Sequence, residues 1–249
     1  MTRQTNETFF DSISSFYDDM IGFKAALERR KAVLNKFLPD SVKTAADLGC
    51  GSGLDSLSLA LKGLKVTAFD QSEGMLRKAG ENASEAALDV QFVKSTIDRI
   101  PKRFSGRFDV TFSLGNTLAN LPPERLSVAV KKISELLNSR GTAVIQILNY
   151  SRILKEDNRI INITEMNGEV FIRFYDFMPE SLNFNILKFK KDKPSERELF
   201  TTKLYPHRKD EFLRLLKDNG LRKVKFYGGL ALQKFEKYNS QDLVVVASK

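Results

Sequence analysis

Three glycines and an acidic residue stand at alternate positions in the segment DLGCGSG, residues 47–53. Glycine has no Cβ, so its backbone can approach a bound molecule closely and can adopt positive φ angles. Asp70 follows at the end of the apolar segment KVTAF. A carboxylate there can accept both hydrogen bonds of a ribose diol. The two features together indicate a binding loop for a nucleotide-type ligand.

The spacing of the glycines excludes two common nucleotide loops. The dinucleotide-binding pattern G-x-G-x-x-G would need a glycine at position 54, which is Leu54. A phosphate-binding P-loop would need Gly-Lys followed by Ser or Thr, and the segment has none. Asp70 alone could equally cap the helix that follows it. Together with the glycine loop, ligand binding is the favoured interpretation.

Apolar strands alternate with amphipathic helices over residues 44–148, which predicts a parallel sheet covered on both faces. One of these helices begins after Ser72, a suitable N-cap, and another carries Leu126 to Leu137 and is expected to end at Gly141. The predicted fold is a doubly wound, mostly parallel α/β sheet of seven strands. They are expected at residues 44–48, 65–69, 89–93, 108–113, 142–148, 222–227 and 242–247. Ligands bind such sheets beyond the carboxyl ends of the strands, where the glycine loop and Asp70 lie.

Three regions are predicted along the chain. Residues 1–40 form a helical segment that covers the site, with one helix over residues 9–20. Residues 41–150 and 206–249 form the core of the binding domain. Residues 151–205 form a small antiparallel β insertion that would serve as a substrate lid or an oligomer contact. Its three strands are expected at residues 169–177, 182–190 and 197–205.

Composition narrows the class of protein. A single cysteine, Cys50, excludes an intrachain disulfide and a multi-cysteine zinc site, and favours the reducing cytoplasm. The segment MTRQTNETFF lacks the apolar core of a signal peptide, and no apolar run approaches the roughly 18 residues of a membrane span. The net charge of +9 is spread along the chain, as on a solvated surface. We expect a cytoplasmic protein without a membrane or metal partner.

The glycine loop and Asp70 resemble those of class I S-adenosylmethionine (SAM) methyltransferases. That family carries a D/E-x-G-x-G-x-G loop and an acidic residue at the end of the second strand, which DLGCGSG and VTAFD match. The resemblance implies a Rossmann-like fold, SAM as cofactor and S-adenosylhomocysteine as product. It implies a set of cofactor-binding residues: Tyr17, Asp47, Gly49, Cys50, Gly51, Gly53, Asp70, Gln71, Thr96, Ile97 and Leu114.

The same resemblance implies individual roles. The three glycines would line the methionine part of SAM, and Asp70 would hold its ribose. Gln71 would flank the adenine, and Tyr17 would approach the cofactor from the N-terminal segment. Asp47 would organise the loop near the methionine amino group.

The adenine side departs from the family pattern. Many members have an aspartate after the third strand that binds the adenine amino group. Here Thr96 stands at that position and Asp98 follows two residues later. Either Thr96 with the Ile97 backbone or Asp98 would bind the amino group.

The segment after the fourth strand resembles glycine N-methyltransferase-like enzymes. LGNTLANL (114–121) is similar to their LGNS-x-x-HL, and NYSRIL (149–154) and LYPHRKDEFLRLLKDNG (204–220) continue the likeness. The resemblance implies methylation of a small-molecule acceptor, with N-methylation preferred over O-methylation. Asn116 and Tyr205 would be the catalytic residues that contact the acceptor, and Tyr175 would border its pocket.

Two departures bear on the acceptor. Leu148 stands where glycine N-methyltransferase has an arginine that grips the substrate carboxylate, and Asn120 replaces the histidine of the HL pair. Leucine cannot pair with a carboxylate, so glycine itself is disfavoured. Arg152 or Arg173 could supply a displaced grip.

Two other functions are left open. The positive charge would suit a methyltransferase of RNA or another macromolecule. A nucleic-acid acceptor is disfavoured, because the sequence lacks N/D-P-P-Y/F/W after the fourth strand and has no cysteine there to attack cytosine. A non-catalytic SAM-binding module would keep the same loop. A homo-oligomer is compatible with the sequence.

Overall fold

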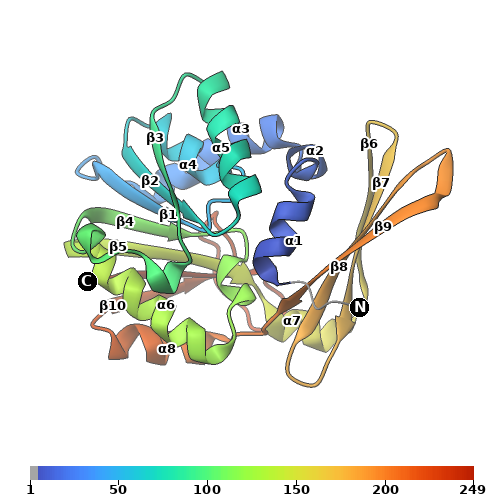
Figure 1. Ribbon diagram of the computed structural model, residues 1–249. Coiled ribbons are helices and arrows are strands. Elements are labelled where there is room, and N and C mark those ends of the chain that lie inside the picture. Colours follow the sequence, from blue (N-terminus) through green and yellow to red (C-terminus); the bar gives the residue numbers. More distant parts are fainter. Residues whose placement is uncertain (1–4) are drawn as a thin grey trace.

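The computed structural model describes residues 5–249 and contains two β-sheets with helices between and around them (Figure 1). The predicted N-terminal segment is seen from residue 5 onward, and its residues 1–4 lie outside the described residues. Among residues 5–249, no helix combines the length and apolar character needed to cross a bilayer.

The larger sheet, sheet A, has the strand order β10-β11-β5-β4-β1-β2-β3. Only β11 is antiparallel to its neighbours, β5 and β10. The strands are β1 (Thr44–Leu48), β2 (Lys65–Asp70), β3 (Val90–Lys94), β4 (Phe108–Ser113), β5 (Leu137–Leu148), β10 (Arg222–Tyr227) and β11 (Asp242–Ser248). This sheet confirms the predicted doubly wound, mostly parallel fold.

Helices bury both faces of sheet A. On one face α6 (Pro123–Leu136) and α8 (Lys209–Asp218) pack over a cluster that includes Leu48 and Phe69. On the other face α3 (Phe23–Leu34) and α4 (Leu54–Ala60) cover Val66 and Val110. Helix α5 (Glu73–Glu85) packs against β2 and β3, and its N-cap is Ser72, as predicted. Short 3₁₀ turns are η1 (Asn35–Phe37), η2 (Ile97–Arg99), η3 (Lys102–Phe104) and η4 (Thr117–Asn120).

The end of α6 differs from the prediction. The helix ends at Leu136 and the chain continues directly into β5, so Gly141 lies inside the strand. A Cβ at Gly141 would lie 2.8 Å from the Leu137 side chain and 3.1 Å from the Phe108 carbonyl oxygen. The glycine therefore allows close packing of β5 and does not end the helix.

The insertion forms a separate antiparallel sheet, sheet B, with the order β6-β7-β8-β9. Its strands are β6 (Ile160–Met166), β7 (Glu169–Phe177), β8 (Leu182–Lys190) and β9 (Lys193–Leu204), and α7 (Tyr150–Glu156) precedes it. The prediction of three strands was wrong, since it missed β6. Within residues 5–249 this edge strand pairs only with β7, and it is mostly exposed, so its residues show little of the burial pattern that marks a strand.

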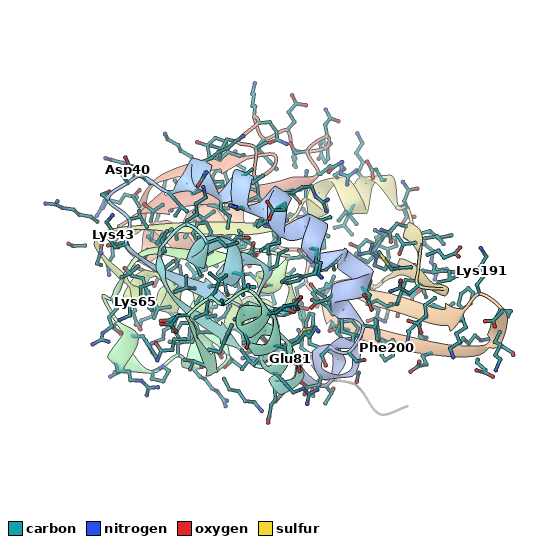
Figure 2. The ribbon with its side chains drawn as sticks, turned by 90° about the horizontal axis from the view of Figure 1, so that it is seen from above. Asp40, Lys43, Lys65, Glu81, Lys191 and Phe200 are labelled. Carbon is teal, nitrogen blue, oxygen red and sulfur yellow. The ribbon has the colours of Figure 1, made fainter. Side chains whose placement is uncertain are left out.

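Helices α1 (Asn6–Ile13) and α2 (Tyr17–Ile21) lie between the two sheets (Figure 1). Phe9 and Phe16 join Phe171 and Phe200 of sheet B in one buried cluster. Figure 2 shows Phe200 where the insertion meets these helices. The predicted helix over 9–20 is broken at residues 14–16. Ser14 ends α1 because its hydroxyl donates 2.8 Å to the Asp11 carbonyl oxygen and competes with the helical pattern.

Phe171→Ala tests how strongly sheet B is joined to the helices. Phe171 is fully buried and stacks on Phe16 with 5.6 Å between ring centroids. Its loss should lower the free energy of unfolding in urea by about 3–5 kcal/mol. Val128→Ala, at an exposed site on α6, should change it by less than about 0.5 kcal/mol. Equal effects of the two variants would contradict the packing role of Phe171.

Candidate functional site

A cavity of about 340 Å³ opens at the carboxyl ends of β1, β2 and β4. The glycine loop after β1 forms one wall, and Asp70 and Gln71 after β2 form the next. Residues of α1, α2 and α3 close the side away from sheet A, among them Phe10, Tyr17 and Arg30. The cavity therefore lies where ligands bind in doubly wound folds.

Backbone geometry holds the glycine loop against β2. The Gly49 and Cys50 N–H groups donate to the Phe69 carbonyl oxygen at 2.7 and 3.0 Å. A Cβ at Gly49 would collide with the Thr117 side chain, whereas a Cβ at Gly51 would meet nothing within 4 Å. Because Gly51 lines the cavity at a φ of +54°, its missing side chain leaves room for a ligand.

Asp70 connects the loop to the start of α5. Its Oδ2 accepts from the Gly51 N–H at 2.8 Å and its Oδ1 from the Ser72 N–H at 2.9 Å. Burial raises the pKa of the Asp70 carboxyl, and these backbone donors act against the shift. Each carboxylate oxygen keeps a further lone pair that can accept from a ligand hydroxyl.

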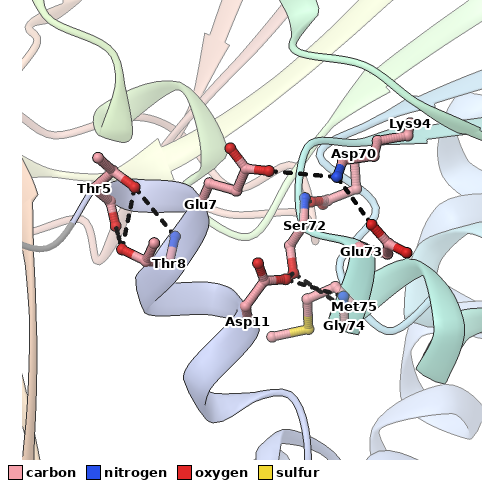
Figure 3. Close-up of polar contacts among 10 residues, drawn as sticks. All are labelled: Thr5, Glu7, Thr8, Asp11, Asp70, Ser72, Glu73, Gly74, Met75 and Lys94. Carbon is pink, nitrogen blue, oxygen red and sulfur yellow. Dashed lines mark hydrogen bonds and ion pairs between the residues drawn. The ribbon is translucent and has the colours of Figure 1, made fainter.

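Helices α1 and α2, residues Asn6–Ile21, form a roof over the cavity. Figure 3 shows the polar contacts of this roof with the start of α5 and with Lys94. Asp11 Oδ1 accepts from the Ser72 hydroxyl at 2.5 Å and from the Gly74 N–H at 2.9 Å. Lys94 Nζ lies 3.5 Å from Glu7 and 3.1 Å from Glu73. The first turn of α5 thus binds the roof on one side and Asp70 on the other.

Acidic groups gather at the far end of the loop. Asp47 is buried and accepts from the Ser56 hydroxyl at 2.5 Å. Burial, with a contribution from the Asp55 charge, raises the pKa of Asp47 to about 8. Arg30 Nε from α3 lies 3.2 Å from Asp55 Oδ1, and both residues line the cavity.

Five buried polar atoms of cavity residues have no hydrogen-bond partner within residues 5–249: Arg30 Nη1, Ser52 Oγ, Asp55 Oδ1, Thr96 Oγ1 and Asn120 Oδ1. A buried polar group without a partner costs about 1–3 kcal/mol. A ligand that carries both donors and acceptors would satisfy these atoms. The cavity therefore fits a polar molecule of nucleoside type with a charged end.

Residues 45–141 match a family described as a methyltransferase domain. A glycine/sarcosine N-methyltransferase of Aphanothece halophytica is 25% identical over 214 residues, which cover 85% of this chain and 79% of that enzyme. A glycine/sarcosine/dimethylglycine N-methyltransferase of Actinopolyspora halophila is also 25% identical, over 91% of this chain, but the chain spans only 40% of its length. The CcbJ methyltransferase of Streptomyces caelestis shares the fold, with a TM-score of 0.82 at 23% identity over 98% of each chain.

The family match, the relatives and the shared fold together indicate a class I SAM-dependent methyltransferase. The cofactor of this methyltransferase is SAM. The cavity fits that molecule, because SAM combines a ribose diol and an adenine with an amino-acid end that carries both an ammonium and a carboxylate group.

The structure brings most of the predicted cofactor residues to this one cavity: Tyr17, Gly49, Cys50, Gly51, Asp70, Gln71, Thr96, Ile97 and Leu114. Asp47 and Gly53 do not line it. Gly53 begins α4 at a φ of +92° and packs close to Leu57 and Ala79. Asp98 does not line it either and is held by Arg125 at 2.8 Å, which leaves Thr96 and Ile97 at the cavity.

Neither of the two predicted catalytic residues, Asn116 and Tyr205, is among the residues that line the cavity. Asn116 has a φ of +68° and spends its amide on internal bonds, donating to Tyr150 Oη at 2.8 Å and accepting from the Leu148 N–H at 3.0 Å. The Tyr205 N–H donates to the Ala119 carbonyl oxygen at 2.7 Å. Their contact with an acceptor stays a prediction.

Sequence reasoning missed Arg30, Asp55 and Asn120 as cavity residues. Asp55 had a visible signal, since an acidic residue in the first turn of the helix after the loop faces the ligand end of that helix. Arg30 stands in a run of basic residues, and nothing in the sequence distinguishes it from its neighbours. The packing of α3 on α4 is what brings it to Asp55.

A second group of polar residues lies beyond Tyr17, on the face of sheet B that packs against the roof. On β7 the buried Phe171 and Tyr175 point to this inner face, so Arg173 between them does too. Arg173 Nε donates to Asn162 Oδ1 at 2.7 Å, and within residues 5–249 no carboxylate lies within 4.0 Å of its guanidinium. Burial lowers the pKa of Arg173, against the influence of the Tyr17 and Tyr175 phenols.

Asp47→Asn tests the buried acid. Because the folded-state pKa of Asp47 is raised to about 8, folding retains a proton that the unfolded chain releases above about pH 4. The free energy of unfolding should therefore fall as the pH rises from about 4 to about 8, by up to about 1.4 kcal/mol per pH unit for one proton. Chemical unfolding across this range should show a flatter profile for Asp47→Asn. Asp40→Asn, at an exposed position, should keep the wild-type slope, and an unchanged slope in Asp47→Asn would contradict the shift.

Proposed function

We propose that this methyltransferase transfers the methyl group of SAM to an amine nitrogen of a small-molecule acceptor. The observation that carries the proposal is the cavity at the carboxyl ends of β1, β2 and β4, which is lined by the glycine loop, Asp70 and Tyr17. The similarity to glycine/sarcosine N-methyltransferases over 85% of the chain supports an amine.

The residues at the cavity suit the parts of SAM. We assign Asp70 to the ribose hydroxyls and the glycine loop to the methionine part. Gln71, Thr96 and Ile97 would surround the adenine. Arg30 Nη1 is free for the methionine carboxylate, and Asp55 beside it can attract the ammonium group.

The reaction asks mainly for positioning. SAM supplies a methyl group bonded to a positively charged sulfur. The sulfur is a good leaving group, because it departs as the neutral thioether of S-adenosylhomocysteine. The chain must hold a neutral amine in line with that methyl, and such alignment can lower a barrier by about 7–11 kcal/mol. The roof would exclude water during the reaction. Burial, followed by the charges of Asp55 and Asp70, raises the pKa of Tyr17 to about 12, so its phenol stays a hydrogen-bond donor near neutral pH.

Asn116 and Tyr205 stand at the acceptor side in this proposal. Asn116 fixes Tyr150, whose phenol is buried, and so would position the wall that the acceptor meets. Tyr205 begins the segment that returns from sheet B to the core and would border the same space.

S-adenosylhomocysteine release from SAM tests the function. The acceptor panel contains small amines, amino acids and carboxylates, with bulk tRNA and rRNA alongside. We expect turnover on an amine. Turnover on RNA alone would contradict the proposal in favour of a macromolecular acceptor, and SAM binding without turnover on any acceptor would favour a non-catalytic module.

Asp70→Ala tests the cofactor assignment separately. Loss of the ribose contact and of the bonds that hold Gly51 and Ser72 should weaken SAM binding at least about tenfold in calorimetry. Asp40→Ala, on an exposed loop, is the matched control and should bind like wild type. Near-normal binding by Asp70→Ala would remove the assignment.

Arg173 is our candidate for recognition of an acidic group on the acceptor, because Leu148 cannot provide it and Arg173 has no carboxylate partner of its own among residues 5–249. For an amine that carries a carboxylate, Arg173→Met should raise KM by at least about tenfold, since a charged hydrogen bond contributes about 1.5–3 kcal/mol. SAM affinity should not change. Arg214→Met, at an exposed site on α8, should leave KM as it is. Equal KM values in both variants would contradict this role.

A further inference from the structure

The outer face of sheet B, which points away from the roof, is apolar in its middle. Phe171 and Tyr175 of β7 point inward, so Ile172 between them points outward. The strand register places Ile163 opposite Ile172, Ile172 opposite Leu187, and Leu187 opposite Leu199. These four side chains form a continuous outer row across all four strands.

The two ends of this row are exposed to solvent, and its two middle members are half-buried. None of its members belongs to a buried cluster of the protein or packs against one. Ile163 is 61% exposed and Leu199 56% exposed. An antiparallel sheet with one face in water usually alternates apolar and polar residues along each strand. Sheet B is apolar on both faces, which is the pattern of a sheet packed between two layers.

The neighbouring row on the same face carries opposite charges at its two ends. Glu165 of β6 is opposite Val170, Val170 is opposite Phe189, and Phe189 is opposite Arg197 of β9. Arg197 has no carboxylate within 4.0 Å among residues 5–249. Among residues 5–249, the exposed Glu165 forms an ion pair only with the exposed Lys191. An acid on one edge strand and a base on the other make the face complementary to itself.

We propose that a second copy of this chain covers the outer face of sheet B. Two sheets packed face to face lie about 10 Å apart. A two-fold axis that lies between them and parallel to the strands places β6 of one copy across from β9 of the other. The outer row then meets its own copy, and Glu165 faces Arg197 of the partner subunit. A lipid surface would favour a uniformly basic rim, and the mixture of Glu165 with Arg197 does not provide one.

The placement of the insertion suits this contact. Sheet B projects from the body of the molecule, with Lys191 at its far end, so a second copy can reach the outer face without meeting sheet A (Figure 2). The inner face of the same β7 strand carries Arg173 and Tyr175. The second copy would therefore support the strand that forms the wall of the acceptor side.

The oligomeric state in solution tests the proposal. Sedimentation velocity at micromolar concentrations should show a dimer for the wild type. The double variant Ile163→Lys, Leu199→Lys places charges in the outer row at sites already exposed in one copy, and should raise the dimer dissociation constant at least about a hundredfold. Val128→Lys is the matched control, an exposed apolar residue on α6. It should leave the dimer unchanged.

A charge exchange tests the orientation. Arg197→Glu should weaken the dimer, because Glu165 would then face another acid. Combining it with Glu165→Arg restores an opposite pair across the interface and should recover most of the lost association.

A monomeric wild type at these concentrations overturns the proposal, as does a dimer that withstands the double lysine variant. If the wild type is monomeric and floats with vesicles of phosphatidylcholine and phosphatidylserine through Ile163 and Leu199, the face binds lipid and the proposal fails. The measurement needs neither SAM nor an acceptor, so its outcome is independent of the proposed function.

Discussion

The hydrogen bonds of the Asp70 carboxylate determine the shape of the cofactor cavity. One oxygen holds the Gly51 N–H of the loop, and the other holds the Ser72 N–H at the start of α5. Ser72 in turn donates to Asp11 of the roof. The loop, the helix and the roof are therefore all connected, directly or through Ser72, to the Asp70 side chain. The groups that would contact the cofactor keep fixed positions relative to Asp70.

The roof connects the cofactor side of the molecule with the insertion. Its polar contacts, through Asp11 and Glu7, go to the first turn of α5 and to β3. Its aromatic residues Phe9 and Phe16 go to sheet B. Apolar packing and hydrogen bonds act on different faces of the same short helices. A shift of sheet B would therefore move Asp11 and, through Ser72, the surroundings of Asp70. The two halves of the site are thus mechanically linked.

Local patterns predicted most of the fold, because strand periodicity, glycine spacing and the Ser72 cap act over a few residues. The cavity residues found this way, such as Gly51 and Asp70, belong to one loop and one strand end. Arg30 could not be predicted, since its place depends on how α3 packs on α4. The edge strand β6 was missed because burial marks it weakly. The side chain of Asn116 turns to Tyr150, a contact between segments 34 residues apart that no local pattern shows.

The insertion leaves and rejoins the core at the carboxyl ends of the parallel strands of sheet A. It departs after β5, which ends at Leu148, and returns at Tyr205, whose N–H is bonded to Ala119 in the turn after β4. A segment anchored in this way can lengthen, shorten or change sequence without shifting the register of any core strand. Under the proposed function, selection can therefore act on the acceptor side while the cofactor half is kept. One scaffold can in this way diversify its substrates during evolution.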